Sequence, residues 1–289
     1  MSLPLPGLSA ESFASAVSRI ARFRGQTVVV KLGGSAMEDP AATDACLKSI
    51  AALNHLGIQL VVIHGGGKPI DRAMAAAGLT PKKVAGRRYT DDETLAIVVR
   101  ILKDEINVEL VAKLEALGCE AVSASDLLYG DQLKLRGPDN TEIDLGRVGT
   151  IKYVSSDILE DYSCNYCVPV IPSLAIADDR GWLNVNADTA ASAVAGAMKA
   201  EKAIFLTDTP GVLRDRQDPQ SLLSRLTENE CRKLIETGII DGGMVPKVEA
   251  CFEALEAGAK AALILDGRIP FSLLNVFLHN NFTGTEITR

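Results

Sequence analysis

Short apolar runs that alternate with longer helical patterns constrain this chain more than any other feature. Five runs rich in Val, Ile and Leu indicate buried strands, over residues 28–32, 60–64, 168–172, 203–207 and 261–266. Six segments have apolar residues at helical spacing, over residues 41–56, 69–77, 90–117, 187–198, 228–237 and 246–257. Because parallel strands need crossover connections, this order predicts an α/β fold, a three-layer α/β/α sandwich around a mainly parallel open sheet.

Residues 121–151 interrupt this order. Short pieces with strand preference surround the turn signal Gly137-Pro138-Asp139-Asn140. We therefore expect a β-hairpin insertion. It could cover a substrate pocket, and a plain surface hairpin fits the sequence equally well.

Two lysines stand in settings that suit phosphate. Lys31 follows three valines and precedes a glycine turn, and Lys247 opens a predicted helix. Between them in the chain, Asp188 stands at the start of another predicted helix. Fixed cations can neutralise the charge that spreads over a phosphoryl group in transfer. Taken singly, Lys247 is equally explained as surface charge and Asp188 as an acid favoured by a helix dipole. Together they favour phosphoryl transfer.

Glycine turns follow the first two predicted strands, at residues 33–34 and 65–67. Glycine lets backbone N–H groups approach an anion closely, and ligands of open α/β sheets bind at the carboxyl ends of the strands. Neither turn is a P-loop, because Val62 and Pro69 stand where Gly and Ser or Thr are required. One such turn alone is more readily an ordinary strand-to-helix connection. Two in succession, with the lysines, favour a phosphate site.

Arg88 and His64 carry weaker signals. Arg88 precedes an acidic helix start, which it could screen, or it could bind a substrate carboxylate with a fork that lysine lacks. His64 lies at a strand end beside glycines, where a structural hydrogen bond is a better explanation than catalysis.

Several function classes conflict with the composition. The formal net charge of −7 argues against nucleic acid as a partner, and no apolar run approaches the roughly 20 residues that span a membrane. Residues 1–6 lack the pattern of a signal peptide, and six scattered cysteines indicate reduced thiols in a cytoplasmic protein. Cys164 and Cys167 form a single CxxC motif, with no second such motif and no histidine nearby, so a zinc site is not expected. We assign no metal-binding residues.

Five motifs together carry a resemblance to a known family. In chain order they are VVVKLGG, VVIHGGGKPID, NVNADTAASAVAGAMKAEKAIFLTDTPGVL, GGMVPKVEAC and ILDGRIPFSLL. The chain resembles the amino acid kinase family from about residue 25 to residue 287. Within it, the chain is most similar to members that use ATP to phosphorylate the γ-carboxylate of N-acetyl-L-glutamate in arginine biosynthesis. The resemblance implies that residues 26–198 bind the acyl amino acid and residues 199–289 bind ATP.

The resemblance also implies site residues. Lys31 and Lys247 would stabilise the transferring phosphoryl group, with Asp188 orienting both lysines. Backbone N–H donors to phosphate and substrate would come from Gly33, Gly34, Gly65 and Gly66. The α-carboxylate end of the substrate would be held by Arg88 and Asn184. The nucleotide contacts would be Asp208, Thr209, Pro210, Gly211, Val212, Leu213, Ile239, Ile240 and Asp241.

The implied chemistry needs no general base. A γ-carboxylate has a reference pKa of about 4.3, so it is already an anionic nucleophile at neutral pH. Hydroxyl-directed kinases must instead accept a proton from their substrate. Mg²⁺ is expected to bridge the ATP phosphates with few or no direct protein ligands.

The residues beside Arg88 depart from the family pattern. Arg87 and Tyr89 stand where the family usually has an apolar residue and a valine. The acyl-group preference therefore stays open, and a sister kinase acting on an aminoadipate derivative is an alternative. A non-catalytic regulator that binds nucleotide or arginine is a second alternative. The presence of Lys31, Asp188 and Lys247 together argues against it.

The N-terminal segment, residues 1–25, is a candidate oligomerisation element. Residues 9–24 form an amphipathic pattern with Phe13, Val17, Ile20 and Phe23 on one face. Family members inhibited by arginine use a comparable helix to join dimers into a hexamer. We expect a homo-oligomer, at least a dimer, and leave two arrangements of this helix open: contact between dimers, or packing on its own subunit. Arginine inhibition is a separate hypothesis, because Asn275 stands where Glu is expected.

Overall fold

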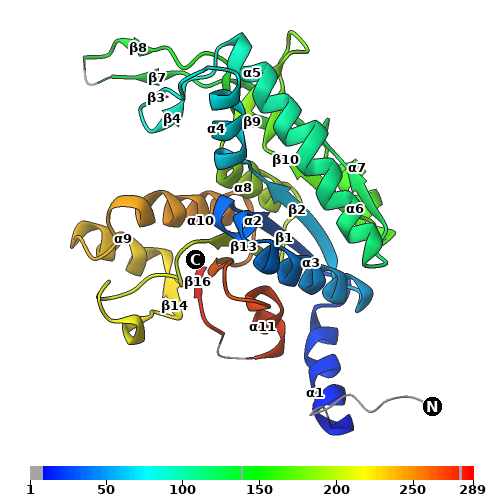
Figure 1. Ribbon diagram of the computed structural model, residues 1–289. Helices are drawn as coiled ribbons and strands as arrows, with labels where there is room; N and C mark the ends of the chain where they lie inside the picture. The colour runs from blue at the N-terminus through cyan, green and yellow to red at the C-terminus, as the bar shows by residue number, and fades with distance from the viewer. Residues whose placement is uncertain (1–8, 138, 280–281) are drawn as a thin grey trace.

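The computed structural model describes residues 9–137, 139–279 and 282–289, and an eight-stranded sheet forms its centre (Figure 1). Residues 1–6 and Pro138, used above, lie outside this part. The strand order is β14 (Arg225–Thr227), β16 (Thr285–Thr288), β15 (Ala262–Asp266), β13 (Lys202–Thr207), β1 (Thr27–Leu32), β2 (Gln59–His64), β10 (Val168–Pro172) and β5 (Ala121–Ser123). Within this sheet only the β15–β16 pair is antiparallel. The predicted mainly parallel sheet is confirmed, and the five predicted strands agree within one residue at each end.

Helices cover both faces of the sheet and enclose two cores. Along β1, Val28 and Val30 belong to one core and Val29 to the other, as the two-residue period of a strand requires. The first core lies under α3 (Pro40–His55), α6 (Val108–Ala116) and α11 (Ser272–Leu278). The second lies under α7 (Ser156–Cys164), α8 (Ala187–Ala197) and α10 (Val245–Ala257). A strand buried on both sides needs apolar residues at every position, which explains its continuous valine run.

Polar residues set the starts of several helices. The Asn186 side chain accepts hydrogen bonds from the first turn of α8 at 2.8 and 3.1 Å. Thr227 and Glu230 form a capping box that begins α9 (Glu228–Glu236). The remaining short helices are α2 (Gly34–Glu38), α4 (Gly67–Ala76), η3 (Pro219–Ser221) and η4 (Gly242–Met244).

The helix predicted over residues 90–117 is continuous but not uniform. Asp91 caps its first turn by accepting from the Thr94 N–H at 2.8 Å, so α5 (Asp92–Val99) begins two residues later than predicted. A π-helical stretch, η2 (Arg100–Asn107), separates α5 from α6. There, buried Asn107 donates to the Val170 carbonyl at 2.9 Å and to His64 Nε2 at 3.0 Å. Apolar spacing predicted a helix and could not distinguish a π pitch from an α pitch.

The segment 121–151 is more than the hairpin predicted for it. The hairpin exists as β7 (Leu135–Arg136) and β8 (Glu142–Ile143), but β5 belongs to the central sheet. The strands β6 (Leu128–Gln132) and β9 (Val148–Val154) close a small barrel with β11 (Leu174–Ile176) and β12 (Trp182–Val185). These partners are distant in sequence, so local turn signals could not reveal the pairing. A second hairpin, β3 (Lys83–Val84) and β4 (Arg87–Arg88), lies near α4 (Figure 1).

The N-terminal helix is present as α1 (Ala10–Ile20), capped by Ser9 and followed by η1 (Ala21–Phe23). Its apolar face is divided. Ile20 is buried and Phe23 packs edge-to-face on Phe277 of α11 at 5.0 Å, whereas Phe13 is 57% exposed. No helix in the described part of the chain is long and apolar enough to cross a membrane.

Candidate active site

The predicted site residues converge because three neighbouring parallel strands end at one edge of the sheet. Lys31 of β1 is in register with Phe205 of β13, and Leu32 is in register with His64 of β2. The sheet extends from β1 through β2 in one direction and from β13 through β15 in the other. The strand ends around β1 therefore form a topological switch point, where α/β proteins bind ligands.

Lys31 and Asp188 form an ion pair at this edge. The Lys31 ammonium lies 2.8 Å from Asp188 Oδ1, and the two side chains are only 12% and 26% exposed. Asp188 sits in the first turn of α8, where a helix dipole favours a negative charge. Water and salt screen such a pair less than a surface pair, so the Lys31 side chain is well fixed.

Gly33 makes room for this lysine. A Cβ at Gly33 would lie 2.6 Å from the Leu206 carbonyl oxygen and 2.9 Å from Lys31 Nζ. At Gly34, by contrast, a Cβ would meet nothing within 4 Å. The first glycine is therefore required for packing, while the second begins α2 with its backbone exposed.

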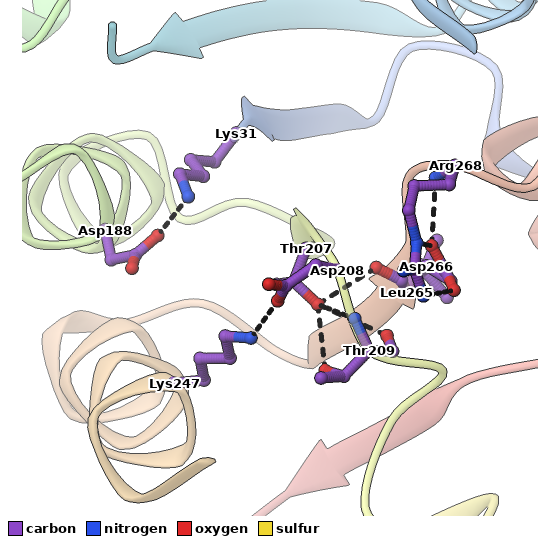
Figure 2. A network of polar contacts seen from close by, with 9 residues as sticks. All are labelled: Lys31, Asp188, Thr207, Asp208, Thr209, Lys247, Leu265, Asp266 and Arg268. Carbon is purple, nitrogen blue, oxygen red and sulfur yellow. Dashed lines mark hydrogen bonds and ion pairs between the residues drawn. The ribbon is translucent and has the colours of Figure 1, made fainter. Parts of the chain in front are cut away.

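Lys247 lies in the first turn of α10, as predicted, but its partner differs from the expected one. Its ammonium lies 2.6 Å from Asp208 Oδ1, just past the end of β13 (Figure 2). The hydrogen bond from Lys247 lowers the pKa of Asp208 below its usual range. Asp188 was expected to orient both lysines; in the structure it pairs with Lys31, whereas Lys247 pairs with Asp208. The reason is that Asp208 follows β13 directly and is within bonding distance of the start of α10.

A polar network supports the end of β13. Thr207 accepts a hydrogen bond from the Thr209 N–H at 3.2 Å and donates to the Leu265 carbonyl at 3.4 Å. On the neighbouring strand, Arg268 donates to both oxygens of Asp266 at 2.9 and 2.7 Å (Figure 2). Thr207 thus ties the start of the Asp208 loop to β15, and the Arg268–Asp266 pair fixes the turn that follows β15.

A first cavity of about 220 Å³ lies beside the glycine turn after β2. Its lining combines residues 65–67, 86–88 and 184–187 with Ile70, Leu102, Val148 and Ser173. Four predicted substrate residues are among them: Gly65, Gly66, Arg88 and Asn184. Arg88 donates to Asp71 at 2.5 Å and to the Gly67 carbonyl at 3.1 Å, and Asn184 donates to the Thr90 hydroxyl at 3.1 Å.

A second cavity of about 420 Å³ lies at the end of β13. Eight of the nine predicted nucleotide residues line it, namely residues 208–213 with Ile239 and Ile240. Asp241, the ninth, is not part of the lining, but it forms an ion pair with Arg216, which is. Lys247 forms part of the wall, next to Gly243 and Met244. The walls are mainly apolar, with Lys247 and Arg216 as the cations in the lining, which suits a flat aromatic base attached to phosphate.

His64 has a structural environment, as expected. It is fully buried, and burial lowers its pKa to about 4. Its Nε2 accepts from the Asn107 amide, so the ring is a neutral hydrogen-bond acceptor.

Comparison with known proteins identifies the family. Residues 26–266 match the sequence profile of the amino acid kinase family. The chain belongs to this family. A relative named acetylglutamate kinase from Methanosphaera stadtmanae is 40% identical over 281 residues, covering 94% of each chain. A relative with the same name from Brachyspira hyodysenteriae is 38% identical over 272 residues, covering 93% of each chain.

Solved structures of similar fold agree with the family. An N-acetylglutamate synthase from Neisseria gonorrhoeae, complexed with coenzyme A and N-acetyl-glutamate, matches with a TM-score of 0.85 and 25% identity. That match covers 98% of this chain, which spans 64% of the synthase. Carbamate kinase from Giardia lamblia bound to AMP-PNP has a TM-score of 0.66 at 18% identity, over 92% of this chain and 99% of that one. The second likeness shows the amino acid kinase fold.

Several cavity residues of this amino acid kinase were not predicted. Ser173, Asn186 and Ala187 line the first cavity, and Arg216 lines the second. Asn186 and Ala187 stand inside the motif that contains Asp188, so their place in the sequence was a usable signal. Ser173 and Arg216 carried no such signal. No cluster of three or more His, Cys, Asp or Glu that could hold a metal occurs among the described residues.

Proposed function

We propose that this chain is an acetylglutamate kinase. It would transfer the γ-phosphoryl group of ATP to the γ-carboxylate of N-acetyl-L-glutamate, giving ADP and N-acetyl-L-glutamyl 5-phosphate, a step of arginine biosynthesis. The names of relatives that cover nearly the whole chain support the substrate. The observation that carries the reaction type is the pair of lysines, each fixed by its own aspartate, at the switch point between a polar cavity and an apolar one.

The acceptor oxygen would attack the γ-phosphorus while the bond to the bridging oxygen of ADP breaks. No proton moves, because the carboxylate is already ionised. Lys31 and Lys247 would bind the equatorial phosphoryl oxygens, and their aspartates would limit side-chain motion. This arrangement favours the transition state through fixed charge, with little reorganisation during the reaction.

Backbone N–H groups of four glycines would complete the phosphoryl and substrate contacts, at Gly33, Gly34, Gly65 and Gly66. A Cβ at Gly66 would lie 2.7 Å from Leu102 and 2.8 Å from Ile106, so the backbone approaches η2 closely there. Mg²⁺ would neutralise phosphate charge when bound. We propose that ATP itself holds the ion, since the described residues provide no ligand cluster.

We assign the two cavities to the two substrates. The first cavity, within residues 26–198, would take the acyl amino acid, with Arg88 and Asn184 near its α-carboxylate. The second, within residues 199–289, would take the adenine and ribose. Its apolar wall of Pro210, Val212, Ile239 and Ile240 supports this assignment.

We also propose that α1, with its exposed Phe13, joins dimers into a hexamer, and a mass in solution that shows only dimers would contradict that arrangement. More generally, we propose that the chain is a homo-oligomer, at least a dimer. A mass in solution that corresponds to a single chain would contradict this. Inhibition by arginine is a separate proposal, and full activity at saturating arginine would remove it.

One assay tests the main proposal. ATP turnover would be measured with acetylglutamate, free glutamate, aspartate and acetylaminoadipate, and the acyl phosphate trapped as a hydroxamate. We expect trapped product with acetylglutamate at the highest kcat/KM. A preference for acetylaminoadipate would identify the sister kinase instead, and ATP binding with no trapped product would indicate a regulator.

A further inference from the structure

His64 is a buried titratable group that the proposed reaction does not use. It ends β2, directly before the glycine turn of the first cavity. Burial lowers its pKa to about 4, so at neutral pH the ring is uncharged and carries one N–H. The nitrogen that carries this hydrogen donates a hydrogen bond and the other accepts one. The groups around the ring determine which is which.

Buried Asn107 places the ring hydrogen on Nδ1. Its amide nitrogen donates to the Val170 carbonyl at 2.9 Å, and because a carbonyl only accepts, this bond sets the orientation of the amide. The same nitrogen donates its second hydrogen to His64 Nε2 at 3.0 Å. Nε2 is therefore the acceptor, and Nδ1 donates to the Gly65 carbonyl at 3.3 Å. The orientation is kept although Asn107 Oδ1 is buried without a partner among the described residues.

The bond to the Gly65 carbonyl also sets the direction of the next N–H group. Gly65 and Gly66 share a planar trans peptide, in which the C=O of one residue and the N–H of the next point in opposite directions. A carbonyl held toward the buried ring therefore turns the Gly66 N–H away from it, and both glycines line the first cavity. Gly66 is buried, yet its N–H donates to no acceptor in the described part of the chain. Buried N–H groups are nearly always paired, which indicates a ligand oxygen as its partner.

Phosphoryl transfer needs donors whose direction is fixed before charge develops on the oxygens. Glycines let the turn approach a ligand closely, but they also leave its peptides free to rotate. We propose that His64 is a positioning residue: its bond to the Gly65 carbonyl holds the Gly66 N–H toward the reacting end of the substrate. His64 touches no reacting atom and moves no proton. Close packing of Gly66 on η2 fixes where the turn lies, and the ring fixes how its peptide is rotated. This inference rests on the proposed function for the identity of the bound oxygen.

Two substitutions separate the roles of the two ring nitrogens. The amide nitrogen of asparagine can take the place of Nδ1, so His64→Asn keeps a donor to the Gly65 carbonyl and loses the acceptor for Asn107. The amide of glutamine extends to the place of Nε2, so His64→Gln keeps the acceptor and loses the donor. His55→Gln is the control, because His55 is exposed and ends α3, before β2 begins, at the opposite end of that strand from His64.

The two variants should rank in opposite orders for stability and for turnover. Denaturant unfolding should find His64→Asn the less stable, because it leaves a buried Asn107 donor unpaired. Under conditions where both are folded, His64→Asn should keep kcat within about tenfold of wild type, whereas His64→Gln should lose about 100-fold, with KM changed less than about threefold. His55→Gln should resemble wild type in both measurements. A histidine that only stabilises the fold would instead make turnover follow stability.

A second measurement on wild-type protein does not depend on how the variants fold. Nitrogen-15 NMR of the labelled histidine rings reports which nitrogen carries the hydrogen, and substitution of the two exposed histidines, His55 and His279, identifies the His64 signals. We expect hydrogen on Nδ1. Hydrogen on Nε2 would overturn the inference, and so would a kcat of His64→Gln equal to or above that of His64→Asn. Absence of acyl phosphate from active-site-intact wild type is a different result, which would refute the proposed function and this role of His64 with it.

Discussion

Replacing Gly33 with alanine tests how closely the end of β1 is packed against the site. The new methyl would lie 2.6 Å from the Leu206 carbonyl oxygen, whereas even close C–H···O contacts between strands are about 3.3–3.6 Å. The ends of β1 and β13 must therefore separate by about 0.7–1 Å. The same methyl would lie 2.9 Å from Lys31 Nζ, so the ammonium must also move. Backbone strain is not involved, because φ of Gly33 is −97°.

The geometric misfit gives the expected size of both effects. Overpacking of this kind costs about 1–3 kcal/mol of unfolding free energy. A displacement of about 1 Å at a catalytic group can lower the rate about 100-fold. We expect Gly33→Ala to show both losses, measured by denaturant unfolding and by hydroxamate-trapped turnover.

Gly34→Ala is the matched folding control. The added methyl would meet nothing within 4 Å, and residue 34 is the first residue of α2. The free energy of unfolding should therefore be unchanged or slightly higher. If Gly33→Ala unfolds like wild type and keeps kcat within about threefold, the packing argument is refuted.

Three further predictions concern charge. Lys31→Met and Lys247→Met should each lower kcat about 10²- to 10³-fold with smaller effects on KM, as steady-state kinetics would measure, and wild-type turnover in either variant would contradict the assigned roles. The hydrogen bond from Lys247 lowers the pKa of Asp208 below 3.8, so the pair stabilises the fold at pH values above about 3.8. This contribution to the free energy of unfolding disappears as the pH falls through the folded-state pKa. The difference in unfolding free energy between wild type and Asp208→Asn should therefore shrink in acid, and a pH-independent difference would argue against the pairing. Burial lowers the pKa of His64 from 6.5 to about 4, so the neutral ring makes its full contribution to the free energy of unfolding above pH 6.5. About 3 kcal/mol of that free energy is lost as the pH falls from 6.5 to 4. Unfolding measured over that range should show a shallower slope for His64→Gln than for wild type, and equal slopes would mean that the histidine is not buried neutral.

Much of the fold could be predicted because it depends on local patterns. The valine run of β1 is apolar at every position since helices cover both of its faces. The helix predicted from residue 187 begins there as α8, and the structure shows that the Asn186 side chain caps it. The small barrel was not predicted, because β6 and β9 pair with β11 and β12, which are distant from them in the sequence. The π-helical stretch η2 was predicted as part of an α-helix, because its apolar residues have the spacing that an α-helix also shows.

The candidate site divides in the same way. The sequence by itself determined that Lys31 and Lys247 stand near glycine turns, at a strand end and a helix start, and that Asp188 stands at another helix start, because dihedral freedom and helix capping act within a few residues. The tertiary structure decided which carboxylate meets which lysine. Asp188 reaches Lys31 and Asp208 reaches Lys247, because β13 lies beside β1 and α10 begins next to the end of β13. It also decided that Arg88 is neutralised by Asp71, since charge pairing depends on distances that only folding sets.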